Sequence, residues 1–136
     1  MRVETFPIAP IVIADDDTND LFFATRALKK GGIATPVLTC ADGLEVVSTV
    51  KRLLDTATLP RVVFLDIKMP QMNGFQVLKW IRENEKLNVV PVVMLSGSNE
   101  PRDTEMARAL GADGYLVKPP TTTSIAEAVG IVRRHS

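Results

Sequence analysis

The chain has 136 residues, and its 16 lysines and arginines balance its 16 aspartates and glutamates. This length suits one domain with a sizeable apolar core, and the balanced charge argues against binding to nucleic acid or to an anionic membrane, which normally requires a basic excess. The single cysteine, Cys40, excludes an internal disulfide, and no stretch resembles a signal peptide or a membrane helix, so a cytoplasmic location is expected.

Short apolar runs alternate with amphipathic segments along the chain. Such runs predict buried parallel strands, because both faces of these strands are covered and the usual alternation with polar residues disappears. The predicted strands are 11–14, 36–40, 61–66, 92–95 and 115–117, and the predicted helices are 21–30, 44–55, a segment from 75, a segment from 101, and 124–134.

Two of these helices carry a specific expectation for their buried face. The expected stripes are Leu44, Val47, Val50 and Leu54 in the second helix, and Ile125, Ala128, Val129 and Val132 in the last. Ser124, with Glu127 three residues later, predicts a capping box at the start of the last helix.

Five strands alternating with five helices predict an α/β fold, in which a doubly wound five-stranded parallel sheet has helices on both faces. No repeat or linker divides the chain, so residues 1–136 are expected to form one domain. Residues 1–8 are expected to form a short N-terminal extension, and no output domain is expected.

Charged or hydroxyl side chains follow four of the predicted strands. Asp15 and Asp16 follow the first strand, Asp66 ends the third, Ser96 follows the fourth and Lys118 follows the fifth. Because ligands bind at the carboxyl ends of parallel strands, these side chains are expected to form one site. Clustered carboxylates without histidine or cysteine favour Mg²⁺, with Mn²⁺ as the alternative. Carboxylate, metal and lysine together indicate phosphoryl transfer, with an aspartate as the nucleophile.

Four stretches, IVIADDD, VVFLDIKMPQMNG, PVVMLSGS and GADGYLVKPP, resemble the receiver domain of two-component response regulators, in the same order. The resemblance implies a flavodoxin-like (βα)5 fold and a phosphoprotein that signals in a phosphorelay rather than an enzyme. It implies that Asp66 is the phosphoacceptor, that Lys118 and Ser96 assist the transfer, that Ser96 and Tyr115 form a switch, and that Lys118–Pro119 is a cis peptide. Its implied metal ligands are Asp16 directly, Asp15 largely through water, Asp66, and the main-chain carbonyl of Lys68.

The same resemblance implies the partners. They would be a sensor histidine kinase or a phosphotransfer protein. Output would go through another partner, through onward phosphotransfer, or through a homodimer formed by the fourth helix, the fifth strand and the last helix. The long segments 31–60 and 83–88 are more similar to the stand-alone regulators paired with bacterial phytochromes than to the chemotaxis type.

Several alternatives remain open at the level of sequence. The chain could be a degenerate receiver that binds partners without phosphorylation, or a receiver cut from a hybrid histidine kinase. A haloacid-dehalogenase-type phosphatase would need a second acid where Lys68 stands, and a flavodoxin-type cofactor site would need a phosphate loop in place of the acidic triplet. Asp17 fits a helix cap at least as well as a site residue, and Tyr115 could simply pack.

Overall fold

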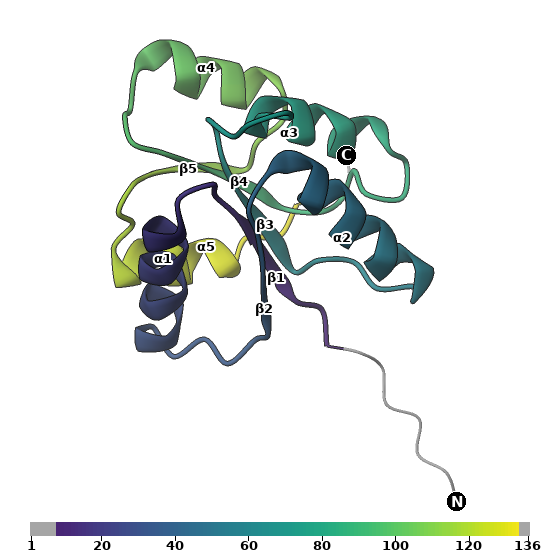
Figure 1. Cartoon of the computed structure of the whole chain (residues 1–136), viewed down its shortest axis with the longest axis horizontal. Coiled ribbons are helices and arrows are strands. Elements are labelled where there is room, and N and C mark those ends of the chain that lie inside the picture. Colours follow the sequence, from purple (N-terminus) through teal and green to yellow (C-terminus); the bar gives the residue numbers. More distant parts are fainter. Residues whose placement is uncertain (1–7, 134–136) are drawn as a thin grey trace, which may run out of the picture.

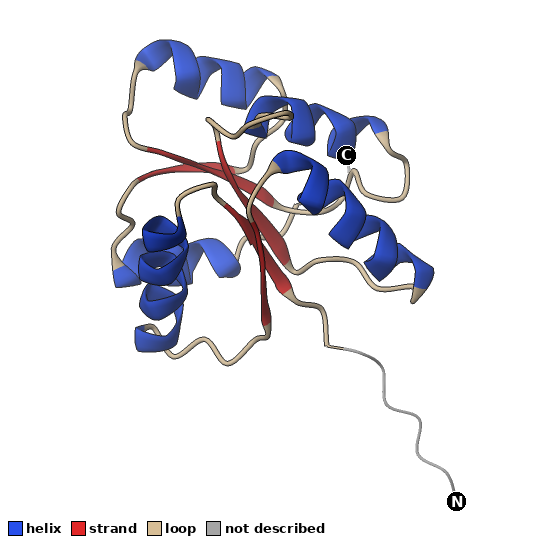
Figure 2. Ribbon diagram, viewed as in Figure 1, coloured by secondary structure: helices blue, strands red, loops and turns tan. Residues whose placement is uncertain are grey.

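The five predicted strands form one parallel sheet in the computed structural model, which describes residues 8–133. They are β1 (Ile11–Ala14), β2 (Val37–Cys40), β3 (Val62–Asp66), β4 (Val92–Ser96) and β5 (Gly114–Val117). The order across the sheet is β2-β1-β3-β4-β5, and every neighbouring pair is parallel. The strands lie together between the helices (Figure 2). This arrangement confirms the predicted flavodoxin-like fold. The predicted N-terminal extension lies almost entirely outside the described residues.

Helices cover both faces of the sheet, as the apolar strand sequences predict. They are α1 (Thr18–Lys30), α2 (Gly43–Asp55), α3 (Gly74–Glu83), α4 (Pro101–Ala109) and α5 (Thr122–Val129). One layer contains α1 and α5, and the other contains α2, α3 and α4 (Figure 1). Between residues 8 and 133, no helix combines the length and the apolarity needed to cross a membrane.

Each buried strand contributes alternate side chains to two separate cores. In β1, Ile11 and Ile13 pack with α1 and α5, whereas Val12 and Ala14 pack with α2 and α3. All four side chains are fully buried. A strand between two helical layers therefore requires apolar residues at every position, which is why the run itself was a reliable strand signal.

The first helix begins three residues before its predicted start at Leu21. The side chain of Asp17 accepts hydrogen bonds from the main-chain amides of Asn19 and Asp20, so it caps α1. The interpretation of Asp17 as a cap is confirmed, and the acidic triplet thus includes a helix-start signal.

The prediction for the last helix is wrong at both ends. α5 ends at Val129 rather than at residue 134, and its cap is the Thr121 hydroxyl, which accepts from the Ser124 amide, rather than a capping box at Ser124. Val132 is 71% exposed, while Ile131, which lies off the predicted stripe, packs against the core. Gly130 is the C-terminal cap of the helix, and contacts of the next residues with distant parts of the chain replace further helical turns.

The predicted stripe of α2 is also partly wrong. Val50 is buried as expected, but Val46 and Thr49 complete the buried face, and Leu44 is 51% exposed. The helix starts at Gly43, where a Cβ atom would overlap the main-chain carbonyl of Met72. The start of α2 therefore packs tightly against the loop at Met72, a contact that cannot be inferred from the spacing of apolar residues.

A cluster of ion pairs lies where α3, the start of β4 and the chain after α5 meet. Asp113 Oδ2 accepts from Arg82 at 2.8 Å and from the Val92 amide at 2.9 Å, and Asp113 Oδ1 accepts from Arg133 at 3.0 Å. Burial, followed by the charge of Arg133, lowers the pKa of Arg82 to about 10, although Asp113 opposes the shift. Asp113 therefore forms ion pairs with two guanidinium groups and joins three segments distant in sequence.

Candidate functional site

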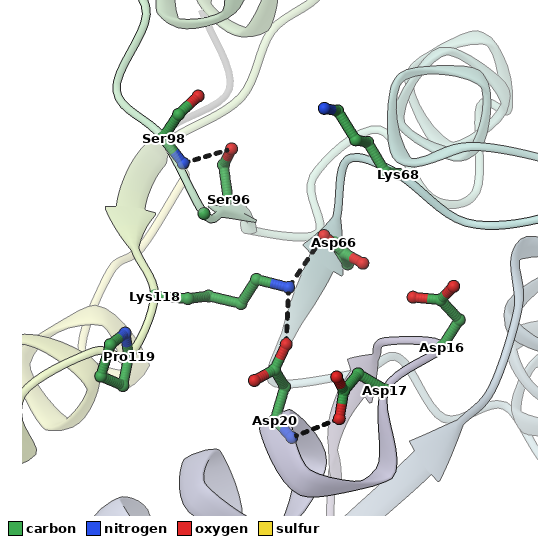
Figure 3. A pocket seen from close by; sticks show the side chains of 10 residues that line it. Asp16, Asp17, Asp20, Asp66, Lys68, Ser96, Ser98, Lys118 and Pro119 are labelled. Atoms are coloured by element: carbon green, nitrogen blue, oxygen red, sulfur yellow. Dashed lines mark hydrogen bonds and ion pairs between the residues drawn. The ribbon is translucent and has the colours of Figure 1, made fainter.

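The register of the sheet brings the predicted site residues to one edge. Ala14 pairs with Leu65, Asp66 with Leu95, and Ser96 with Val117, so the strands end nearly level. An open pocket of about 680 Å³ lies at this edge (Figure 3). The residues that line it are Asp16, Asp17, Asp20, Asp66, Lys68, Ser96, Gly97, Ser98, Lys118 and Pro119.

The ammonium group of Lys118 is bound by three carboxylates. Its Nζ donates to Asp15 Oδ2 at 2.9 Å, to Asp20 Oδ2 at 2.9 Å and to Asp66 Oδ1 at 3.2 Å. Burial by itself lowers the pKa of Lys118, but the hydrogen bonds to Asp15 and Asp20 and the charges of Asp66 and Asp15 raise it on balance. The lysine is therefore a fixed positive charge at the centre of the site. The peptide bond that follows it, Lys118–Pro119, is cis, as predicted.

Asp66 is held at the base of the pocket in an environment that resists its ionisation. Its side chain is 6% exposed. Burial and then the charge of Asp15 raise the pKa of Asp66 to about 6, although Lys118 opposes the shift. The chain after β3 returns closely over this residue, because Gly74 donates to the Ile67 carbonyl and a Cβ on Gly74 would overlap the Asp66 carbonyl. The absence of a side chain at Gly74 therefore allows the start of α3 to pack directly against the main chain of Asp66.

Three carboxylates at this edge are close enough to share one cation. Asp15, Asp16 and Asp66 each offer an oxygen within 4.8 Å of those of the other two. Asp16 is exposed, whereas Asp15 and Asp66 are buried. An all-oxygen donor set suits a hard cation such as Mg²⁺ or Mn²⁺, and the mutual repulsion that raises the pKa of Asp66 would be relieved by one. The donor set therefore fits the predicted metal.

Ser96 and Tyr115 are joined through the main chain of one loop residue. The Ser96 Oγ accepts from the Ser98 amide at 3.2 Å, and the Tyr115 hydroxyl donates to the Ser98 carbonyl at 2.8 Å. Tyr115 is half-buried and packs against the core cluster on the side of the sheet that α2, α3 and α4 cover. Ser96 and Tyr115, which the resemblance pairs as a switch, are therefore linked by hydrogen bonds to the same residue, Ser98.

Comparison with known proteins identifies the family. Residues 11–130 match the response regulator receiver domain. The chain belongs to this family. This match confirms the interpretation as a two-component response regulator, and the acidic pocket is the pocket of a receiver domain. Receiver domains are signalling modules rather than enzymes.

The receiver has relatives of similar length. It is 31% identical over 125 residues to the protein PilG of Pseudomonas aeruginosa, in a match that covers 92% of this chain and 85% of PilG. Its structure is similar to that of the bacteriophytochrome response regulator AtBRR, with a TM-score of 0.81, 28% identity and 96% of each chain covered. It is also similar to the bacteriophytochrome response regulator RtBRR, with a TM-score of 0.80, 30% identity, and 96% of this chain and 82% of that chain covered. The predicted likeness to phytochrome-associated regulators is confirmed by this similarity.

One residue of the receiver pocket was missed at the level of sequence. Asp20 lies in the first turn of α1, yet its carboxylate contacts Lys118, which is 98 positions away in the chain. A signal was available: an acid in the first turn of a helix that starts at the ligand-binding edge of the sheet. Acids are common there because of the helix dipole, however, and this general preference obscured a role in the site.

Proposed function

We propose that this receiver accepts a phosphoryl group on Asp66 from a phosphohistidine of a sensor histidine kinase or a phosphotransfer protein. The observation that carries the proposal is the Asp66 carboxylate, buried at the base of an open pocket and 3.2 Å from the Lys118 ammonium. A carboxylate oxygen forms a bond to phosphorus while the phosphorus–nitrogen bond breaks. The bonding electrons remain on the imidazole ring, which takes up a proton, and water later hydrolyses the acyl phosphate.

The residues around Asp66 supply the charge that this reaction needs. Negative charge on the transferred group is spread over its equatorial oxygens, and Lys118, which lies 3.2 Å from Asp66, would neutralise one of them. Asp16 directly, Asp15 largely through water, Asp66, and the main-chain carbonyl of Lys68 would hold Mg²⁺, or Mn²⁺ in its place. When bound, the cation supplies Lewis-acid charge for the phosphoryl oxygens.

The proposed output is a change at Ser98. A phosphoryl oxygen on Asp66 offers the Ser96 hydroxyl a stronger, charged acceptor. The hydroxyl then turns away from the Ser98 amide, the loop relaxes and the Tyr115 hydroxyl loses its fixed acceptor. The face formed by α4, β5 and α5 is remodelled as a result, and this face is the expected surface for a homodimer or another partner.

Ser96→Ala tests this coupling. We expect the variant to take up phosphate but to lose the phosphorylation-dependent change in Tyr115 fluorescence, because no hydroxyl transmits the new charge. Tyr115 is the only tyrosine, and Trp80→Phe removes the competing tryptophan signal. An unchanged fluorescence response in Ser96→Ala would contradict the coupling.

Acetyl phosphate with Mg²⁺, followed by intact mass spectrometry, tests the proposed function itself. We expect a mass gain of one phosphoryl group in the wild type and none in Asp66→Asn, because the amide is not a nucleophile for phosphorus. Asp103→Asn, which changes a half-buried acid on α4 away from the pocket, is the matched control and should gain the same mass as the wild type. No gain in the wild type would overturn phosphoacceptance and favour a degenerate receiver that binds partners without phosphorylation.

A further inference from the structure

Asp20 has a contact that its place in α1 does not require. The cap of α1 is Asp17, whose carboxylate accepts the main-chain amides of Asn19 and Asp20. The side chain of Asp20 instead extends toward β5 and accepts from Lys118 Nζ at 2.9 Å. This distance equals that to Asp15 and is shorter than the 3.2 Å to Asp66. The carboxylate therefore belongs to the receiver pocket rather than to the helix end.

The ammonium has three N–H bonds in a tetrahedral arrangement, and three carboxylates accept them. Asp66 and Asp20 approach the nitrogen from different sides, with Asp20 coming from α1 (Figure 3). Once Asp15 and Asp20 have bound two of the N–H bonds, the direction of the third is determined, and it points at Asp66. Without Asp20, only Asp15 and Asp66 would hold the ammonium, and once a phosphoryl group replaces the Asp66 contact, the flexible four-carbon stem of lysine would be held by Asp15 alone.

We propose that Asp20 is a positioning residue for phosphoryl transfer, which together with Asp15 holds the Lys118 ammonium so that its remaining N–H bond points at the reacting group. This inference rests on the proposed function. On phosphorylation, a phosphoryl oxygen replaces Asp66 Oδ1 as the acceptor of that bond, while the other two hydrogen bonds stay as they are. The charge that stabilises the transferred group is thus oriented before the reaction begins.

Two substitutions of Asp20 separate positioning from simple charge. Asp20→Ala removes both the acceptor oxygen and the negative charge, whereas Asp20→Asn removes the charge and keeps an acceptor. If Asp20 positions Lys118, the phosphorylation rate falls about tenfold in Asp20→Ala and stays within about threefold of the wild type in Asp20→Asn. If its charge merely repels the incoming anion, both variants speed up alike, and the proposal is overturned.

The experiment is a time course of intact mass with acetyl phosphate and Mg²⁺ for the wild type and both variants. Asp17→Asn is the matched control, because it removes one negative charge from the same pocket, keeps a capping oxygen and does not touch Lys118. Thermal unfolding verifies that each variant is folded. Equal rates in the wild type and in folded Asp20→Ala would overturn the inference while leaving the proposed function intact.

A second measurement does not depend on phosphorylation. In the free protein, the ammonium protons of Lys118 are protected by their carboxylate acceptors, and their exchange with water can be followed by NMR. We expect exchange to be at least about tenfold faster in Asp20→Ala and little changed in Asp17→Asn. If the wild type takes up no phosphate, the proposed function fails by itself, and unchanged protection in Asp20→Ala would then overturn the placement of Lys118 as well.

Discussion

Replacing Lys118 with alanine is expected to lower the rate of phosphoryl uptake on Asp66 by a factor of about 10² to 10³. The lysine is the cation that contacts Asp66 in the described part of the chain, and no second basic side chain there forms an ion pair with this cluster. In the Lys118→Ala variant, the negative charge on the phosphoryl oxygens would therefore lack the ammonium group that neutralises it. The rate of mass gain with acetyl phosphate and Mg²⁺ measures the effect.

The same substitution should also weaken the fold. Asp15, Asp20 and Asp66 would lose their shared cation, and the pKa of Asp66, already raised to about 6, would rise further. Removing one member of a buried ion-pair cluster costs about 3 kcal/mol of unfolding free energy, which urea denaturation without metal would detect. Lys79→Ala, an exposed lysine on α3, is the control and should change neither quantity. A Lys118→Ala variant that phosphorylates at the wild-type rate would show that Lys118 does not act in the transfer.

Asp113→Ala is expected to lower the free energy of unfolding by about 3 to 5 kcal/mol. Its carboxylate accepts from Arg82 and Arg133 and from the Val92 amide. The side chain of Arg82 is only 11% exposed, so a substitution at Asp113 leaves a buried guanidinium group without its counter-charge. Arg82 and Arg133, which both donate to the Gly111 and Asn88 carbonyls, would then lie close together without a shared carboxylate.

Urea denaturation of Asp113→Ala measures this effect, and Asp103→Ala is the control, since it removes an acid that forms no ion pair within residues 8–133. Because Asp113 lies far from the pocket in the fold, the phosphorylation rate of the folded variant should remain close to that of the wild type. A loss below about 1 kcal/mol would indicate that water replaces the carboxylate and that the cluster contributes little.

The fold was predictable because its strongest signals are local. Four consecutive apolar residues, such as those of β1, strongly favour a buried strand, and the alternation of strands and helices restricts the topology. The ends of elements were less predictable. The length of α5 depends on the residues after the helix, since Ile131 and Arg133 make contacts with distant segments that compete with another helical turn.

The chemical type of the pocket was also present in the sequence, because a residue that ends a parallel strand is placed at the ligand edge by the strand itself. The positions of Asp15, Asp66, Ser96 and Lys118 at the ligand edge are predicted in this way, and their roles in phosphoryl transfer are proposed from the likeness to receiver domains. Asp20 could not be assigned, because its contact with Lys118 depends on the angle at which α1 leaves the sheet.

By itself, the sequence therefore determined the parallel sheet, the ligand edge and the residue types that meet there, because these depend on hydrophobic runs and on the direction of the chain. Only the tertiary structure decided which side chains touch. The three-carboxylate contact of Lys118, the link from Ser96 to Tyr115 through Ser98, and the pairing of Asp113 with two arginines all join residues from different elements. Such contacts depend on how the helices and loops pack on the sheet. The buried faces of α2 and α5 differ from those that the spacing of apolar residues predicts, so this spacing specifies the orientation of a helix only approximately.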